Sequence, residues 1–355
     1  MEHSTIMKKL NLLHGTLLAL ALFCATALVA QTAPQAGVQQ FASLGDFKLT
    51  SGETLVDCQL GYRTLGTLNA DKSNAILFPT WYGGTTEQLA GNAAPGGLAD
   101  SSKYFVILVD ALGNGVSSAP SNSKAQPRMK FPRISMRDMV NAEHEMLVKV
   151  LHIDHLRAVM GISMGGMQTF QWMVSYPEFM DKAIPIVGSP RQTAFDLEHW
   201  QADNEAIMAD PAWKGGDYAS MPPLALRAKL NGMMMTTPER FNETNTREQV
   251  LASFQKPAEN TSDDPNNHIR QAEAMMSLDV SDVFGGDMSK AAAAVKAKVL
   301  VVSSKQDHMV VPAPALAFAK QIGAEVLLLD GNCGHLATSC ESGKMVPVVQ
   351  AFLSK

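Results

Sequence analysis

Short runs of hydrophobic residues recur along the chain, and most of them have the length of a β-strand. These runs are 74–78, 104–109, 156–160, 182–187, 298–302 and 324–329. They are rich in Val, Ile and Leu and nearly continuous, which is typical of strands covered on both faces of a sheet. Helix-length segments separate several of them; in 135–151, Met139, Ala142, Met146 and Val150 recur at spacings of three or four. This alternation predicts an α/β fold, with a mostly parallel sheet wrapped by helices.

One interval breaks the alternation of strand and helix. Residues 191–290 contain no convincing strand pattern, but helical patterns, a Pro-Pro pair and a polar stretch follow one another there. An interval of this length between two core strands predicts an inserted, mainly helical cap. We therefore expect a core built from 31–190 and 291–355, with the cap at 191–290.

The first thirty residues, 1–30, have the pattern of a secretory signal peptide. Two lysines at positions 8 and 9 precede an apolar run, and small residues close it. Cleavage after Ala27 and cleavage after Ala30 both stay open. Polar residues interrupt the run, which is short against the roughly 20 apolar residues that cross a bilayer. We expect an exported protein, periplasmic or secreted, without stable membrane insertion after cleavage.

Composition and charge exclude several function classes. The 355 residues are 46% hydrophobic and 18% charged, as in ordinary globular proteins. Lys and Arg total 29 against 34 Asp and Glu, so there is no basic excess for a nucleic-acid partner. Because no His-x-x-x-His or Cys-x-x-Cys spacing occurs, we do not expect a metal site. We expect no resident cofactor either.

Residues 161–166, Gly-Ile-Ser-Met-Gly-Gly, carry the sharpest chemical signal. The hydrophobic run 156–160 leads directly into them, and a helical pattern continues from Met167. A nucleophile elbow needs this order of strand, tight turn and helix, because the strained turn holds the serine hydroxyl clear of the sheet. We predict that Ser163 is a nucleophile; the alternative is a glycine-rich turn with an inert serine.

A serine nucleophile needs a base, and the base needs an acid that orients it. In an elbow fold the two partners follow the serine in the order Asp or Glu, then His. Asp307 comes after the run 298–302, and His335 comes after the run 324–329, each just past the end of a predicted strand. We predict His335 as the base and Asp307 as its acid, with His308 as the alternative base.

Acyl transfer also requires backbone donors for the oxyanion. The N–H of Met164 is the expected first donor, and the second should come from the turn 79–84, Pro-Thr-Trp-Tyr-Gly-Gly. We choose the N–H of Tyr82 for the second donor, with Trp81 as the alternative and as a candidate for substrate binding. The other interpretation of this turn is an ordinary glycine-rich loop.

Three cysteines remain after cleavage, and an oxidising compartment permits one disulfide among them. Cys333 and Cys340 are close in sequence and flank His335, whereas Cys58 lies in the run 55–60, which has the pattern of a strand with buried side chains. We predict a Cys333–Cys340 disulfide. Three reduced, partly buried thiols are the alternative.

Together these features resemble the homoserine O-acetyltransferases, a family with the α/β-hydrolase fold. The segments that carry the likeness are 61–69, 104–107, 112–115, 136–140, 161–172, 210–216 and the turns that hold Asp307 and His335, which together span nearly all of the mature chain. The resemblance implies that Ser163 is acylated, that His335 and Asp307 complete a triad, and that the insertion shapes the acceptor pocket.

The chain departs from that family where the acetyltransferases bind an amino acid. Leu336 follows the predicted base, where those enzymes typically have an Asp that holds the amino group of homoserine. Arg227 is the nearest candidate for the cap arginine that grips the amino-acid carboxylate, and Met233, Met234 and Met235 replace more polar residues. These departures argue against an amino-acid acceptor.

We therefore expect an enzyme that hydrolyses a small acyl ester through an acyl-serine, with water as the acceptor. The first alternative is an O-acyltransferase with an alcohol acceptor, for which acyl-CoA would be a co-substrate. Acetyl-CoA is a cytoplasmic donor, which disfavours this alternative for an exported protein. The second alternative is a non-catalytic binding protein that keeps the fold and its pocket.

Overall fold

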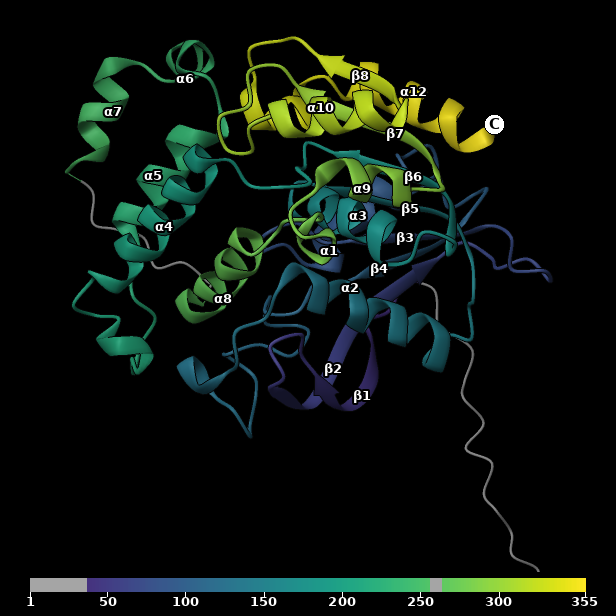
Figure 1. Cartoon of the computed structure of the whole chain (residues 1–355). Helices are drawn as coiled ribbons and strands as arrows, with labels where there is room; N and C mark the ends of the chain where they lie inside the picture. Colours follow the sequence, from purple (N-terminus) through teal and green to yellow (C-terminus); the bar gives the residue numbers. More distant parts are fainter. Residues whose placement is uncertain (1–36, 256–263) are drawn as a thin grey trace, which may run out of the picture. The chain divides into compact units, whose positions relative to one another are not determined.

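The computed structural model describes residues 37–255 and 264–355, which form one sheet with helices around it (Figure 1). The eight strands are β1 (Gln40–Lys48), β2 (Thr54–Leu65), β3 (Ala75–Pro79), β4 (Phe105–Val109), β5 (Leu156–Ile162), β6 (Met180–Ile186), β7 (Lys298–Ser304) and β8 (Glu325–Leu329). Their order in the sheet is β1-β2-β4-β3-β5-β6-β7-β8. Pairing is antiparallel between β1, β2 and β4 and parallel from β4 to β8. The predicted mostly parallel α/β sheet is confirmed.

The helices fall between the strands as the alternation predicted. They are α1 (Thr86–Leu89), α2 (Met136–Glu145), α3 (Met164–Ser175), α4 (Ala194–Met208), α5 (Ala225–Met235), α6 (Pro238–Thr244), α7 (Arg247–Ser253), α8 (Pro265–Met276), α9 (Met288–Ala294), α10 (Ala313–Ile322), α11 (Ala337–Cys340) and α12 (Ser342–Ser354). The helix expected over 135–151 ends at Glu145 and continues as a π turn, Met146–Val150. Ser135 begins α2 with a capping box, in which its hydroxyl accepts from the N–H of Asp138.

Neighbouring residues of each central strand point to opposite faces of the sheet, and each face has its own core. Leu77 and Val159 belong to one core, which also contains side chains of α2, α3, α9 and α10. Ile76 and Met160, their neighbours in sequence, belong to the other core, with side chains of α1 and α12. Because both faces are covered by helices, the central strands are nearly continuous hydrophobic runs in the sequence.

Two strands at the edges differ from the sequence prediction. β1 was not predicted; Ala42 and Phe47 are buried in it, but its register with β2 shifts on both sides of Gly45, so the period of two is lost. β8 was expected to be covered on both faces, yet Val326 and Leu328 are exposed. β8 is the last strand of the sheet, which explains its weaker burial.

Between β6 and β7 the described residues form helices, and their two ends meet. Figure 1 shows α4, α5, α6 and α7 together on one side of the sheet. At the base of this insertion the N–H of Val280 donates to Pro190 O (3.0 Å), and Arg191 Nε lies 2.7 Å from Asp279 Oδ2. We call this junction, 190–192 with 278–280, the neck. The next helix, α9, packs with α3 and α10 of the core, so the helical insertion closes at the neck.

The predicted signal peptide, 1–30, lies outside the described residues. Within the ranges that are described, no helix has both the length and the hydrophobicity needed to cross a membrane.

Candidate active site

Ser163 lies in a sharp turn between β5 and α3. Its backbone has φ 58° and ψ −119°, a conformation that L-residues rarely adopt. Two backbone hydrogen bonds hold it: the N–H of Ser163 donates to Ile186 O, and the N–H of Met167 donates to Ser163 O, both at 2.9 Å. The turn therefore presents the Ser163 side chain at the carboxyl end of the central strand.

Three glycines around Ser163 permit this turn because their neighbours leave no room for a side chain. A Cβ atom at Gly161 would lie 2.2 Å from the backbone of Gly165. At Gly165 it would lie 2.6 Å from Pro79 O, and at Gly166 it would lie 2.7 Å from Ile186 O. The glycines of the motif thus allow β5, α3 and the flanking strands to approach closely.

Ser163, Asp307 and His335 meet at the carboxyl edge of the sheet, and all three are buried. His335 Nδ1 lies 2.7 Å from Asp307 Oδ2, and His335 Nε2 lies 2.9 Å from Ser163 Oγ. Asp307 Oδ1 accepts from the N–H groups of Met309 and Val310, so both carboxylate oxygens act as acceptors. Consequently Nδ1 of His335 carries a hydrogen and Nε2 is left to accept the Ser163 hydroxyl.

The alternative base, His308, is separate from this group. Its side chain is exposed, although its neighbour Asp307 is buried. Consecutive residues of this turn therefore face in different directions, and only Asp307 faces His335.

The loop that carries His335 is fixed on several sides. A disulfide joins Cys333 to Cys340 with their Cα atoms 6.5 Å apart, while Cys58 is buried and free. Ser304 Oγ donates to Gly334 O (2.7 Å) from β7. Thr237 Oγ donates to Asn332 O (2.6 Å) from the start of α6. The loop that carries His335 is thus held by a core strand, by the insertion and by a covalent link.

The turn that follows β3 lies beside Ser163 and is held in place by two glutamines. Gln168 Nε2 donates to Thr80 O (3.1 Å), and Gln271 Oε1 accepts from the N–H of Gly83 (2.8 Å). Between these two anchors, the backbone N–H groups of Trp81 and Tyr82 make no hydrogen bond within the described part of the chain. The same holds there for the N–H of Met164. These three N–H groups are the ones predicted from the sequence as donors to the oxyanion.

A buried polar cluster of cap residues covers the side chain of Tyr82. The Tyr82 ring lies edge-on to Trp200 and His268, with centroids 5.4 and 5.1 Å away. Its hydroxyl donates to Asp203 Oδ2 (3.3 Å), which also accepts from Arg227 Nε (3.0 Å). Burial raises the pKa of Tyr82, so its phenol stays neutral and acts as a donor.

The structure therefore gives Arg227, a predicted binding residue, an acidic partner that the sequence did not indicate. Asp203 lies in α4 and Arg227 in α5, and no motif links the two positions. The only sequence signal is an Asp within the helical pattern of the cap, which solvent-exposed helices show as well.

The other residues singled out from the sequence lie around the same region. Trp81 is half-buried and packs on the core, and Leu336 is half-buried in a 3₁₀ turn, Gly334–Leu336. Helix α5 packs against that 3₁₀ turn. Of its methionines, Met233 is exposed, whereas Met234 and Met235 are half-buried against the core.

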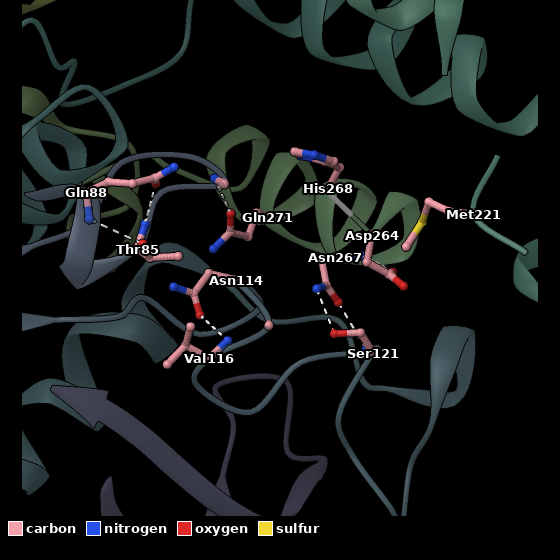
Figure 2. A pocket seen from close by; sticks show the side chains of 12 residues that line it. Thr85, Gln88, Asn114, Val116, Ser121, Met221, Asp264, Asn267, His268 and Gln271 are labelled. Atoms are coloured by element: carbon pink, nitrogen blue, oxygen red, sulfur yellow. Dashed lines mark hydrogen bonds between the residues drawn. The ribbon is translucent and has the colours of Figure 1, made fainter. Parts of the chain in front are cut away.

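A separate polar cavity of about 380 Å³ borders the Tyr82 turn (Figure 2). Figure 2 shows amide and hydroxyl side chains around it, including Gln88, Asn114, Ser121, Asn267 and Gln271. Most of these groups already bond to one another or to backbone; Asn267, for example, bonds to Ser121 through both atoms of its amide. Ser163, Asp307 and His335 do not line this cavity.

Comparisons with known proteins agree with this architecture. A family model described as alpha/beta hydrolase fold matches residues 76–338. The ethyl acetate hydrolase of Pseudomonas veronii is 34% identical over 90% of this chain and 95% of its own. The homoserine O-acetyltransferase of Methanococcoides burtonii is 30% identical over 87% of this chain and 72% of its own. The crystal structure of an acetylester hydrolase from Corynebacterium glutamicum has a TM-score of 0.82 at 34% identity, covering 89% of this chain and 95% of that one.

Proposed function

The chain belongs to the α/β-hydrolase fold family, in the group that includes esterases and homoserine O-acetyltransferases, and from this premise we propose that it is a serine esterase. It is an enzyme of ester hydrolysis or acyl transfer; the proposal narrows this to hydrolysis of small acyl esters, with water as the acceptor. The observation that carries the proposal is the hydrogen-bonded series from Asp307 through His335 to Ser163.

In the first half of the proposed reaction, His335 Nε2 takes the proton from Ser163 Oγ as this oxygen attacks the ester carbonyl carbon. Asp307 keeps His335 oriented through Nδ1 and stabilises the imidazolium. The carbonyl oxygen becomes an oxyanion, to which the N–H groups of Met164 and Tyr82 donate, with Trp81 as the alternative to Tyr82. The C–O bond to the alcohol then breaks, the alcohol takes the proton from His335, and Ser163 remains acylated.

In the second half, water replaces the alcohol. His335 removes a proton from a water molecule, whose oxygen attacks the acyl carbon of the Ser163 ester. The same backbone donors stabilise the second oxyanion. When the bond to Ser163 Oγ breaks, the proton on His335 returns to this oxygen, and a carboxylic acid leaves.

Two features support water rather than an amino-acid acceptor. Leu336 presents an apolar side chain directly after His335, where an amino group would need an acidic partner. Arg227, the candidate for holding a carboxylate, already has Asp203 as its ionic partner. The amino group and the carboxylate of homoserine would therefore both lack an opposite charge in the site. A neutral ester needs neither charge.

The test uses purified protein that begins after residue 30. We expect acetate release from ethyl acetate and from 4-nitrophenyl acetate without any added alcohol, and its loss in Ser163→Ala. If acyl groups move only from acetyl-CoA to an added alcohol such as homoserine, the enzyme is a transferase. If neither reaction occurs, the chain is a binding protein.

We also propose that the protein is exported after cleavage of residues 1–30. The Cys333–Cys340 disulfide supports this proposal, because structural disulfides are rare in reducing compartments. Cell fractionation and N-terminal sequencing of the secreted or periplasmic material test it; a full-length chain found only in the cytoplasm would contradict it.

A further inference from the structure

A buried ion pair of the cap lies near the proposed active site and involves neither Ser163 nor His335. The Asp203 side chain is fully buried in α4, and the Arg227 side chain is 11% exposed in α5. Arg227 Nε lies 3.0 Å from Asp203 Oδ2, and Arg227 Nη2 donates to His268 Nδ1 (3.2 Å). Two of the three guanidinium nitrogens of Arg227 therefore donate hydrogen bonds, and the carboxylate of Asp203 balances its positive charge.

This ion pair lies against the residues that surround the nucleophile. The Arg227 guanidinium is 5.5 Å from the centre of the Tyr82 ring, and the Tyr82 hydroxyl donates to Asp203. Tyr82 belongs to the turn that carries the proposed oxyanion donor. Burial lowers the pKa of His199 in α4; Asp203 and Asp196 oppose this, and the charges of Arg227 and His335 lower the pKa further.

The pairing decides which substrates the guanidinium can attract. A lone buried Arg binds a carboxylate strongly, because it presents two parallel N–H donors. Here Asp203 accepts from Nε and its charge offsets that of the guanidinium, so an incoming carboxylate would meet a buried like charge beside Arg227. Repulsion of this kind excludes wrong ligands as effectively as attraction selects right ones.

We propose that Asp203 is a specificity-determining residue: by neutralising Arg227 it makes the enzyme select uncharged esters and reject esters that carry a carboxylate. The inference rests on the proposed esterase function and names its substrate class. Without the Asp203 carboxylate, Arg227 becomes free to bind an anionic substrate.

The experiment compares substrates that differ only in charge. One pair is 3-acetoxypropanoate and 3-acetoxypropanamide, which places the carboxylate on the alcohol side. The other pair is monoethyl succinate and ethyl succinamate, which places it on the acyl side. For each pair the readout is the ratio of kcat/KM for the anion to kcat/KM for the amide. Because a general loss of activity lowers both values, the ratio isolates the effect of charge.

We expect the wild-type ratio to be well below one for both pairs. Asp203→Asn should raise it by at least about tenfold for one pair or both, mainly through KM of the anion. The double variant Asp203→Asn with Arg227→Gln should return the ratio to near the wild-type value, since both charges are then absent. If the Asn variant does not fold, Asp203→Ser takes its place: it also removes the carboxylate and should raise the same ratio of kcat/KM values.

Asp181→Asn is the matched control. It removes one negative charge as well. Asp181 lies at the amino end of β6, whereas Ser163 and its partners follow the carboxyl ends of the strands, so the ratio should not change. An unchanged ratio in both Asp203 variants would overturn the inference while leaving the esterase function intact. If the wild-type protein hydrolyses neither amide, the proposed function itself has failed.

Discussion

Ser163 Oγ lies 2.9 Å from His335 Nε2, although 172 positions separate the two residues in the chain. The contact forms because β5, β6, β7 and β8 are neighbours in the parallel sheet, so the turns that follow their carboxyl ends meet at one edge. Asp307, at the end of β7, lies behind His335 and holds it toward Ser163. Three loops that are far apart in sequence thus form one hydrogen-bonded series.

Replacing the nucleophile should abolish turnover without unfolding the protein. Ser163→Ala removes the hydroxyl that the mechanism acylates, so kcat/KM for a neutral ester should fall on the order of 10³-fold or more. The thermal midpoint should stay close to wild type, because one small hydroxyl contributes little packing. Ser354→Ala, at the exposed end of α12, serves as the control and should keep full activity. After treatment with a serine-directed phosphonate, adduct mass on any residue other than Ser163 would refute the assignment.

The pH dependence of turnover should separate the two candidate bases. A base must be neutral to accept the Ser163 proton, so kcat/KM should rise with pH as His335 deprotonates. His308→Ala should leave this rising limb in place, because His308 is exposed and turned away. His335→Ala should reduce activity by several orders of magnitude. Full activity in His335→Ala, together with its loss in His308→Ala, would show that the other histidine is the base.

Stability should depend on pH through Glu143, a buried acid in α2 that takes no part in the proposed reaction. The only hydrogen bond that its carboxyl group makes in the described structure comes from Trp172 Nε1 (2.7 Å), and burial raises its pKa from 4.5 to about 8. Between these values the folded state keeps a proton that the unfolded state loses. The free energy of unfolding should therefore fall as pH rises through this window, by up to about 1.4 kcal/mol per pH unit.

Urea unfolding of wild type and Glu143→Gln between pH 5 and pH 8 measures this effect as a difference between the two proteins. The Gln variant should lack the Glu143 part of the slope and become the more stable protein toward pH 8. Glu145→Gln is a suitable control, because Glu145 is partly exposed and pairs with Lys149. Parallel profiles for wild type and Glu143→Gln would mean that Glu143 titrates in its ordinary range.

Breaking the disulfide should affect turnover more than stability. Cys333 and Cys340 bracket His335, and their link closes a short loop, which stabilises the fold by only about 2–3 kcal/mol in the chain-entropy model. Without the link His335 should be less well positioned, so kcat should fall by about tenfold at a temperature where the protein stays folded. Peptide mapping of the oxidised protein should find Cys58 as the free thiol. Free thiols at Cys333 and Cys340 in the oxidised protein would show that no disulfide positions His335.

The glycines of the elbow can be tested against a glycine elsewhere that has space around it. Gly161→Ala would place a Cβ 2.2 Å from the backbone of Gly165, so we expect a loss of about 3 kcal/mol or more, or no folded protein. Gly343 in α12 has nothing within 4 Å of the same atom. Gly343→Ala should therefore stabilise the protein by about 0.5–1 kcal/mol through helix propensity. Equal effects of the two variants on the thermal midpoint would contradict this explanation.

The parts that could be predicted from sequence are those whose signal is local. Each central strand is a buried hydrophobic run, and Ser163, Asp307 and His335 each follow such a run, so their meeting at one sheet edge follows from parallel topology. β1 escaped prediction because bulges around Gly45 remove its alternation. The exposure of β8 depends on its place at the edge of the sheet, which hydrophobicity alone does not reveal.

The pairing in the cap could not be predicted, for a different reason. Arg227 was singled out because of a family resemblance, but its meaning depends on Asp203, which comes from another helix. Which acidic residue meets a given arginine is decided by how α4 and α5 pack, and neither position belongs to a motif. The same residue can bind a substrate carboxylate or be neutralised by the protein, and only the three-dimensional contact distinguishes the two.

The neck formed by 190–192 and 278–280 fixes where the helical insertion leaves the core and where it rejoins it. Because the two ends of the insertion are hydrogen-bonded side by side, the distance that the core must span from β6 to β7 does not depend on what lies beyond the neck. The helices in that interval can therefore differ between relatives without moving β6 or β7, provided that Thr237 keeps its bond to Asn332 O and Gln271 keeps its bond to the N–H of Gly83. An exchange of caps at this junction, in evolution or in the laboratory, must carry both contacts with it if the core is to accept a new substrate.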